Sequence, residues 1–249
     1  MPSPELHGLI LAGGEGSRLL AEGVTVPKPM VQVAGRPQIV HLVETLGALG
    51  CPTITCLVRD EFPEVVAKLV RRPWRGSVRV HACRTPSSLH TLVEGLAHVP
   101  PGPVFATMVD TVMRPDDWRA VFERARSAIA GGADAVLAVT PFVDDEAALY
   151  VSVDTGGRVS RLSDSPMEPR CVTGGVYALA PGTRALAREA ADAGVSRMRH
   201  FLSRLVAGGS VVGAVSVPRI IDLDRLRDLE AANAWLGTVG ELPRNRSAS

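Results

Sequence analysis

Short apolar runs alternate with amphipathic stretches over the first 140 residues of the chain. The runs are rich in Val, Ile, Leu and Ala and end at glycine or a polar residue, as buried strands do. The stretches between them place apolar residues three and four positions apart, as helices packed on a sheet do. We predict strands at 6–12, 53–58, 78–82, 104–109 and 135–139, and helices at 37–49, 64–70, 88–98 and 115–131.

The pattern changes after residue 149. Short segments at 150–153 and 159–162 flank Thr155-Gly156-Gly157, which predicts a β-hairpin inserted after the main sheet. Leu226, Leu229 and Leu236 are in phase on a last helix. The other elements expected in this half are strands at 175–179 and 211–217, helices at 182–193 and 199–207, and a short segment at 220–222 leading into the last helix.

Strands alternating with helices at this spacing predict an α/β fold of three layers, α/β/α, with a mostly parallel, mixed central sheet and a small β-hairpin insertion. The length suits one domain, which we expect to span residues 1–240. Residues 241–249 are polar and rich in Pro, Arg and Ser, which predicts a flexible C-terminal tail.

Composition narrows the function classes. The formal net charge of +1 provides no overall field for nucleic acid or an anionic membrane, so we expect neither as a partner. No apolar run approaches the roughly 20 residues that a membrane span needs, and Met1–His7 lacks the features of a secretion signal. We therefore expect a cytoplasmic protein. The four cysteines have no metal-site spacing, which favours buried reduced thiols.

The first strand ends in a glycine-rich loop suited to binding phosphate. Glycines directly after a strand let backbone N–H groups approach an anion closely. Arg18 adds a planar guanidinium, and Lys28, in Pro27-Lys28-Pro29, adds a compact charge. Lys28 is one of only two lysines in the chain, where arginine is the usual basic residue. The loop residues predicted to bind a nucleotide are Leu11, Ala12, Gly13, Gly14, Gly16, Ser17 and Arg18.

Two other glycine-loop folds fit this segment poorly. In a dinucleotide-binding loop Leu19 would have to be glycine, and the acid after the second strand would lie about 20 residues on, much earlier than Arg59-Asp60. A P-loop requires Gly-Lys-Ser/Thr after the glycines, and that tripeptide is missing. A structural glycine turn followed by a solvated Pro-Lys-Pro loop is the remaining alternative.

The Leu11–Leu19 segment, LAGGEGSRL, followed by Pro27-Lys28-Pro29, resembles the opening of the sugar-phosphate nucleotidyltransferases, whose motif is GGxGxRL…PKP. The resemblance covers roughly residues 6–236 and implies a GT-A-type fold of the small single-domain branch. It also implies transfer of a nucleoside monophosphate from an NTP to a sugar-1-phosphate or similar small phosphorylated acceptor, with release of pyrophosphate.

Carboxylates after two predicted strands are candidate Mg²⁺ ligands. Asp110 follows the strand at 104–109, and Asp222 and Asp224 follow the segment that leads to the last helix. Mg²⁺ prefers hard oxygen ligands, often one or two carboxylates with phosphate oxygens. The resemblance implies a metal on Asp110 and on one acid of the later pair, and which one stays open. Asp224 could instead cap the last helix.

The resemblance also implies roles for the basic residues. Arg18 would stabilise the triphosphate and the departing pyrophosphate, and Lys28 would compensate charge where the two phosphates meet, so that Arg18, Lys28 and Asp110 are the expected catalytic residues. The attacking phosphate oxygen is already anionic, so no general base is needed. Ser87 and Ser88, before the helix at 88–98, would contact the base, although both are also ordinary helix caps.

The acceptor region departs from the family. Asp164-Ser165-Pro166 stands where members carry Glu-Lys-Pro, so the acid is shorter and the lysine is missing. We expect Asp164 to contact the acceptor, and Arg170 or Arg161 to bind its phosphate. Gly175 would lie under the acceptor, where a side chain would block access. The Ser-Ser-Leu at 87–89 is closer to the phosphocholine and phosphonate cytidylyltransferases than to the larger sugar enzymes.

Two other functions remain open. A catalytically inactive relative could serve as a binding or regulatory subunit, as the change at Asp164-Ser165 would allow. A GT-A glycosyltransferase also binds metal through acids, but usually carries Asp-x-Asp in mid-chain and lacks this glycine loop. The sequence leaves open the base, the acceptor and whether the chain forms a homo-oligomer.

Overall fold

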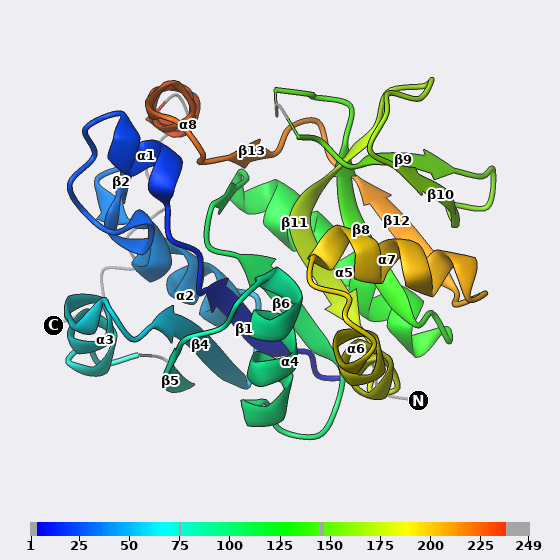
Figure 1. Cartoon of the computed structure of the whole chain (residues 1–249), viewed down its shortest axis with the longest axis horizontal. Helices are drawn as coiled ribbons and strands as arrows, with labels where there is room; N and C mark the ends of the chain where they lie inside the picture. The colour runs from blue at the N-terminus through cyan, green and yellow to red at the C-terminus, as the bar shows by residue number, and fades with distance from the viewer. Residues whose placement is uncertain (1–3, 75, 145–146, 238–249) are drawn as a thin grey trace, which may run out of the picture.

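The computed structural model describes residues 4–74, 76–144 and 147–237. They form a three-layer α/β/α arrangement in which helices cover both faces of a twisted sheet (Figure 1). This agrees with the predicted fold class. The tail predicted at 241–249, like residues 238–240, lies outside the described residues, so the predicted extent of the domain stays a prediction.

The main sheet runs in the order β12-β8-β11-β6-β1-β4-β5. The strands β5, β4, β1 and β6 are parallel, β11 runs antiparallel to β6 and β8, and β12 is parallel to β8. The predicted mixed, mostly parallel sheet is therefore confirmed. The strand bounds are β1 (His7–Ala12), β4 (Thr53–Arg59), β5 (Ser77–Cys83), β6 (Val104–Met108), β8 (Ala135–Thr140), β11 (Val172–Leu179) and β12 (Val212–Ser216).

The two faces of the sheet bury separate hydrophobic cores because side chains alternate along each strand. In β1, Ile10 packs in one core and Leu9 and Leu11 in the other, all at most 2% exposed. The helices on the first face are α2 (Gln38–Ala48), α3 (Pro63–Val70) and α5 (Pro115–Ala130). Those on the second face are α4 (Ser88–His98), α6 (Thr183–Asp192) and α7 (Met198–Ala207).

The hairpin is present, and one strand is longer than predicted. The strands β9 (Tyr150–Val153) and β10 (Val159–Ser163) pair antiparallel and extend from β11, as Figure 1 shows on the right. β11 begins at Val172, before the two glycines that we took as its start. Val172 pairs with Tyr150, which joins the hairpin to the sheet.

Small elements that the periodicity did not reveal surround the end of β1. They include α1 (Ser17–Ala21), η1 (Lys28–Met30) and two short strand pairs, β2 (Gln32–Val33) with β3 (Arg36–Pro37) and β7 (Thr111–Val112) with β13 (Ile221–Asp222). Together with α8 (Leu226–Gly237) they bury a third core that contains Leu19, Val112 and Leu223. This third core joins the amino end of the chain to its last helix.

Within the described ranges, no helix is long and apolar enough to cross a membrane. Three of the four cysteines, Cys51, Cys56 and Cys83, are buried, and Cys171 is half-buried. All four are unbridged, as predicted.

Thiol labelling should follow this burial. Burial raises the pKa of Cys51 and of Cys56 to about 12, so both are thiols at neutral pH and are shielded as well. We expect iodoacetamide to label Cys171 first in the native protein and to reach Cys51 and Cys56 only after unfolding. Peptide mass spectrometry after timed labelling measures this. Labelling of Cys56 at the rate of Cys171 would contradict the packing described above.

Candidate active site

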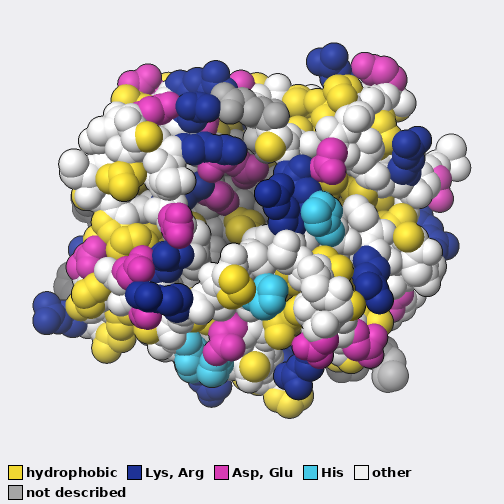
Figure 2. Space-filling view, in the orientation of Figure 1, with side chains coloured by type: hydrophobic (Ala, Val, Ile, Leu, Met, Phe, Trp, Pro, Cys, Tyr) yellow, Lys and Arg dark blue, Asp and Glu magenta, His cyan; other side chains and the backbone are white. Residues whose placement is uncertain are grey.

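Two adjoining cavities open at the carboxyl ends of β1 and β6. The loop cavity, of about 490 Å³, is lined by the glycine loop, Arg59 and the segment 84–88. The acid cavity, of about 550 Å³, is lined by Asp110, Asp222 and Asp224 and by the start of α7. Figure 2 shows this hollow, with acidic side chains between basic ones. Residues common to both cavities are Pro86, Ser87, Ser88 and Met108.

Four predicted catalytic or metal-binding residues form one ion-pair network. The Lys28 Nζ donates to Asp110 Oδ2 at 2.8 Å and to Asp224 Oδ1 at 2.7 Å. Arg18 Nη1 donates to the other Asp224 oxygen, Oδ2, at 2.6 Å. The Lys28 side chain is only 9% exposed, whereas that of Arg18 is 46% exposed. Asp110 and Asp224, which lie 82 and 196 positions after Lys28 in the chain, therefore meet at its ammonium group.

The local sequence explains why Lys28 is buried here. Pro27 and Pro29 flank it, and the short helix η1 turns its side chain inward. Gly16, with φ +66°, lies against it, since a Cβ there would come within 3.0 Å of Lys28 Cβ. Burial alone lowers the pKa of Lys28, but the carboxylates of Asp110 and Asp224 outweigh burial and raise that pKa above its usual value. The lysine is therefore charged at any physiological pH.

Asp110 and Asp222 are brought together by the β7–β13 pair. Asp222 pairs with Thr111, and the Leu223 N–H donates to the carbonyl oxygen of Asp110 at 3.0 Å. The side chain of the fully buried Gln38 stabilises this strand pair, because its Nε2 donates to the carbonyl of Thr111 at 2.8 Å. Both carboxylates line the acid cavity. The arrangement offers two hard oxygen donors side by side.

Asp224 serves a different purpose from the helix cap considered above. Its two carboxylate oxygens accept hydrogen bonds from Lys28 and Arg18. Asp228 instead accepts from the backbone N–H groups of Asp224 and Arg225, at 3.1 and 2.7 Å. Burial raises the pKa of Asp224, but Lys28 and Arg18 oppose it more strongly and hold that pKa below its usual value. Asp224 is the shared counter-ion of Lys28 and Arg18.

Five of the seven loop residues predicted to bind a nucleotide line the loop cavity, and Arg18 lines the acid cavity instead. Gly13, Gly14, Gly16, Ser17 and Leu11 face the loop cavity, whereas Ala12 is fully buried in the core beneath it. Ala12 was predicted to bind nucleotide, and its side chain instead packs against the helices under the sheet. Alternation along β1 explains the difference, because Leu11 and Ala12 point to opposite faces.

Ser87 and Ser88 lie between the two cavities and join α4 to α7. Ser87 Oγ contacts His90 Nδ1 at 2.7 Å and donates to the carbonyl of Ser196. Ser88 Oγ accepts from the backbone N–H of Met198 at 3.0 Å, at the first residue of α7. Neither hydroxyl caps its own helix, α4. Ser87 therefore occupies the N-cap position of α4 without a capping hydrogen bond from its hydroxyl, and the Ser88 hydroxyl instead accepts at the start of a neighbouring helix.

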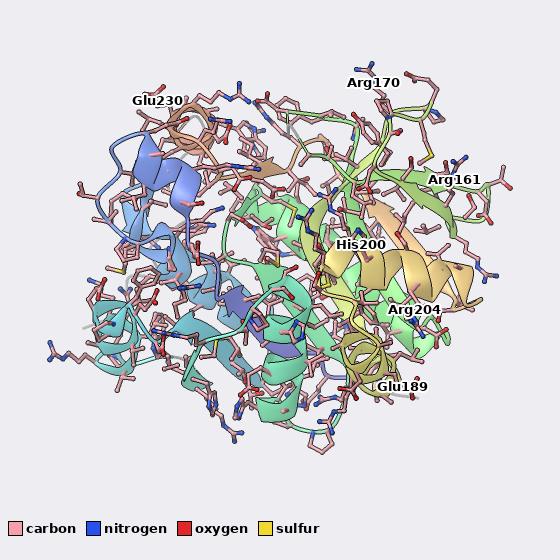
Figure 3. The ribbon with its side chains drawn as sticks, in the orientation of Figure 1. Arg161, Arg170, Glu189, His200, Arg204 and Glu230 are labelled. Atoms are coloured by element: carbon pink, nitrogen blue, oxygen red, sulfur yellow. The ribbon has the colours of Figure 1, made fainter. Side chains whose placement is uncertain are left out.

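The acceptor residues predicted from sequence are placed differently. Arg170 pairs with Glu168 at 3.4 Å, is 61% exposed and lines neither cavity. Figure 3 shows Arg161 and Arg170 at the outer edge of the molecule, beside the hairpin. Asp164 also lies outside the lining and accepts a 2.6 Å bond from Arg199 Nη1. The roles predicted for Asp164, Arg161 and Arg170 therefore stay predictions, since Asp164 and Arg170 lie outside the lining of both cavities and Arg161 lies on β10.

Sequence reasoning missed residues from α7 and from β4. Arg197 and Arg199 line the acid cavity, next to the fully buried Tyr177. Arg59 donates to the carbonyl of Gly13 at 3.4 Å and pairs with Glu15 at 3.3 Å, which steadies the glycine loop. Arg59 was predictable, since it ends the strand parallel to β1. Arg197 and Arg199 stand in no recognisable motif, because only the tertiary fold brings the start of α7 to the acid cavity.

Gly175 lines the acid cavity, but the structure gives another reason for the glycine. Its φ is +71°, and a Cβ would lie 2.5 Å from Thr111 Oγ1 and 3.2 Å from Met108 Cγ. A side chain at position 175 would overlap Thr111, the β7 residue that pairs with Asp222. The role of Gly175 under the acceptor stays a prediction beside this steric reason.

Gly175→Ala is expected to destabilise the protein by about 2–4 kcal/mol, because it combines left-handed backbone strain with a steric overlap. Gly194→Ala is the matched control, since Gly194 has φ +84° and open space around its Cα. The control substitution should lower the free energy of unfolding by about 1 kcal/mol, because it introduces backbone strain without a steric overlap. Thermal unfolding of the two variants measures the difference, and equal losses would show that the Thr111 contact is not restrictive.

Curated relatives match this chain over short stretches. The mannose-1-phosphate guanyltransferase of Kluyveromyces lactis is 42% identical over 67 residues, which is 27% of this chain and 18% of that protein. That of Aspergillus fumigatus is 39% identical over 75 residues, 30% of this chain and 21% of that protein. The alignments thus span about a fifth of the relatives' length.

Solved structures match the whole fold. The inositol-1-phosphate CTP transferase from T. maritima superposes with a TM-score of 0.76 at 17% identity, covering 92% of this chain and 95% of that one. A Bacillus anthracis protein assigned as a glucose-1-phosphate thymidylyltransferase, in complex with sucrose, gives 0.80 at 17%, covering 96% and 98%. A family model matches residues 8–206. The chain belongs to the MobA-like NTP transferase domain family, within the nucleotidyltransferases.

Proposed function

We propose that the protein transfers a nucleoside monophosphate from an NTP to a small phosphorylated acceptor and releases pyrophosphate. The Lys28 ammonium carries this proposal. It is buried between Asp110 and Asp224, which take two of its three N–H groups. The third is left for a phosphate oxygen. A buried, permanently charged lysine beside two cavities suits a reaction that gathers phosphate charge at one point.

Two cavities accommodate two substrates. The NTP would occupy the loop cavity, with its phosphates against the backbone of Gly13–Gly16 and directed toward Arg18, which lines the adjoining acid cavity. The acceptor would occupy the acid cavity, with its phosphate directed at Asp110 and Lys28. Ser87 and Ser88 border both cavities, so their segment would contact the NTP close to the acceptor. The reacting atoms would then meet near Lys28.

The donor set at the junction fits Mg²⁺. Asp110 and Asp222 place two carboxylates on paired strands at the cavity wall, and phosphate oxygens would complete the ligands. No group of three or more potential metal-binding side chains occurs among the described residues, so the substrates would supply the rest. Asp224 suits this role less, because Lys28 and Arg18 occupy both of its oxygens. When bound, Mg²⁺ would neutralise phosphate charge as a Lewis acid.

The chain's own residues would then act by position and charge. An acceptor phosphate oxygen attacks the α-phosphorus in line, and the bond to pyrophosphate breaks as the new P–O bond forms. Lys28 would stabilise the charge that develops where the two phosphates meet, and Arg18 the charge on the leaving pyrophosphate. Asp224 would hold both cations in place through its 2.6 and 2.7 Å contacts. No proton needs to be removed from the nucleophile.

The acceptor could be a sugar-1-phosphate or a phosphocholine- or phosphonate-like compound. Similarity to the mannose-1-phosphate and inositol-1-phosphate enzymes supports the first class. The Ser87-Ser88-Leu89 segment supports the second. A cytoplasmic location, where NTP and Mg²⁺ are abundant, is part of the same proposal.

Pyrophosphate release tests the proposal. Each of the four NTPs is combined with Mg²⁺ and a panel of sugar-1-phosphates, phosphocholine and small phosphonates. We expect one pair to release pyrophosphate and Asp110→Ala to abolish the signal. Absence of both turnover and NTP binding in calorimetry would contradict the proposal. NTP binding without turnover by any pair would favour the inactive binding subunit.

A further inference from the structure

The acid cavity needs a cation on the side opposite its carboxylates. On the carboxylate side of the cavity, Mg²⁺ on Asp110 and Asp222 and the third N–H group of Lys28 would meet the acceptor phosphate. The phosphate oxygens that face away from them need a further cation. The arginines expected from sequence, Arg161 and Arg170, lie at the outer edge of the molecule (Figure 3). The cation therefore has to come from another element.

The start of α7 provides two candidates that line the cavity, Arg197 and Arg199. The Arg199 side chain is 25% exposed, so it is more constrained than a surface arginine. Its Nη1 donates to Asp164 Oδ1 at 2.6 Å, and its Nη2 donates to the carbonyl of Ala147 at 2.5 Å. These two bonds use two of the five N–H groups of the guanidinium, which leaves three for a ligand.

Tyr177 shows that Arg199 and the carboxylates lie near one another. The tyrosine is buried in the wall of the cavity, and burial raises the pKa of its hydroxyl. The charges of Asp222 and Asp110 raise that pKa further, while the charge of Arg199 lowers it. Tyr177, Asp110, Asp222 and Arg199 all line the acid cavity, and Arg199 is the positive member of this group.

We propose that Arg199 binds the phosphate of the acceptor and that Asp164 positions the Arg199 guanidinium without contacting the acceptor. This rests on the proposed function, because it names the residue that receives the second substrate. A guanidinium fixed by a carboxylate and a carbonyl presents its remaining N–H groups as a planar fork, the geometry that phosphate oxygens match. The segment Asp164-Ser165-Pro166 has no lysine of its own. Its acid, Asp164, instead holds Arg199 of α7 in place.

Binding of methyl phosphate tests Arg199 without turnover. Saturation-transfer NMR with Mg²⁺ present should show methyl phosphate bound to the wild type and bound about 10- to 100-fold more weakly to Arg199→Ala, the effect of one charge-assisted bond. Arg199→Lys should recover part of the loss. Arg204→Ala is the control, because Arg204 is an exposed arginine farther along α7 (Figure 3). Equal binding by Arg199→Ala and wild type, or none by the wild type, would overturn the proposal.

The role of Asp164 is tested in two backgrounds. Asp164→Asn should weaken methyl phosphate binding about threefold to tenfold in the wild type, and should have no further effect in Arg199→Ala. An equal effect in both backgrounds would mean that Asp164 acts on its own. The readout also separates this proposal from the proposed function. Arg199-dependent binding in a protein that releases no pyrophosphate with any substrate pair would leave the phosphate site standing and the transferase reaction refuted.

Discussion

Lys28→Met is expected to lower pyrophosphate release about a thousandfold, with NTP still bound. Methionine fills a similar volume but removes the ammonium that Asp110 and Asp224 share at 2.8 and 2.7 Å. The protein then offers no ammonium group to stabilise the charge that develops between the two phosphates. The same change leaves two carboxylates facing each other without their partner. Steady-state assays with the active substrate pair measure the loss.

The variant should also unfold more easily. Removing one member of a fully buried ion pair costs about 3–5 kcal/mol. Asp110 and Asp224 are 21% and 34% exposed, so water should reduce the cost of Lys28→Met to about 2–3 kcal/mol. Lys68→Met is the matched control, since Lys68 is the other lysine and is exposed on α3. A variant with wild-type activity, or one no less stable than Lys68→Met, would refute the role assigned to Lys28.

Asp222→Asn is expected to reduce activity about a thousandfold or more and to raise the Mg²⁺ concentration needed for half-maximal rate. The amide keeps the shape of the side chain and removes one of two negative oxygen ligands. We expect little change in stability, because the substitution also relieves repulsion between Asp110 and Asp222. Activity measured across a Mg²⁺ titration separates loss of metal from misfolding. Asp192→Asn, at an exposed carboxylate ending α6, is the control.

Asp224→Asn should behave differently from Asp222→Asn. Asp224 holds Lys28 and Arg18 through its two oxygens, so its loss should lower stability and activity while leaving the Mg²⁺ requirement unchanged. If the two variants showed the same shift in Mg²⁺ requirement, both acids would be metal ligands. A shift with Asp224→Asn alone would reverse the assignment.

The elements of the fold were largely predictable because they obey simple periodicities. β1, β4, β6 and β8 are continuous apolar runs, and α5 has Pro115 at its start and Gly131 after its end. The short elements β7, β13 and η1 were missed. Strands of two residues and a helix of three carry no period, and they exist because Leu19, Val112 and Leu223 bury one another.

The residues of the site were likewise predictable where a local sequence signal marks them and unpredictable where only the tertiary fold places them. Arg18, Lys28, Asp110 and Asp224 were found because they stand in motifs or directly after apolar strands, and the structure joins them in one network. Arg199 was missed because its place depends on how α7 packs against α4 through Ser88 and Met198. The position of Arg170, exposed and outside both cavities, could not be predicted, because sequence proximity to the hairpin does not fix the direction of a loop.

The β7–β13 pair completes the site only after most of the sheet has been synthesised. Asp222 and Asp224 lie beyond residues 8–206, the stretch matched by the family model, and they join Asp110 across more than a hundred positions. A chain still on the ribosome can form β1, β6 and most of the sheet while Lys28 has only Asp110 as a partner. Only when β13 closes against β7 do both cations acquire their counter-ion, so a nascent chain would hold folded structure well before it holds a working site.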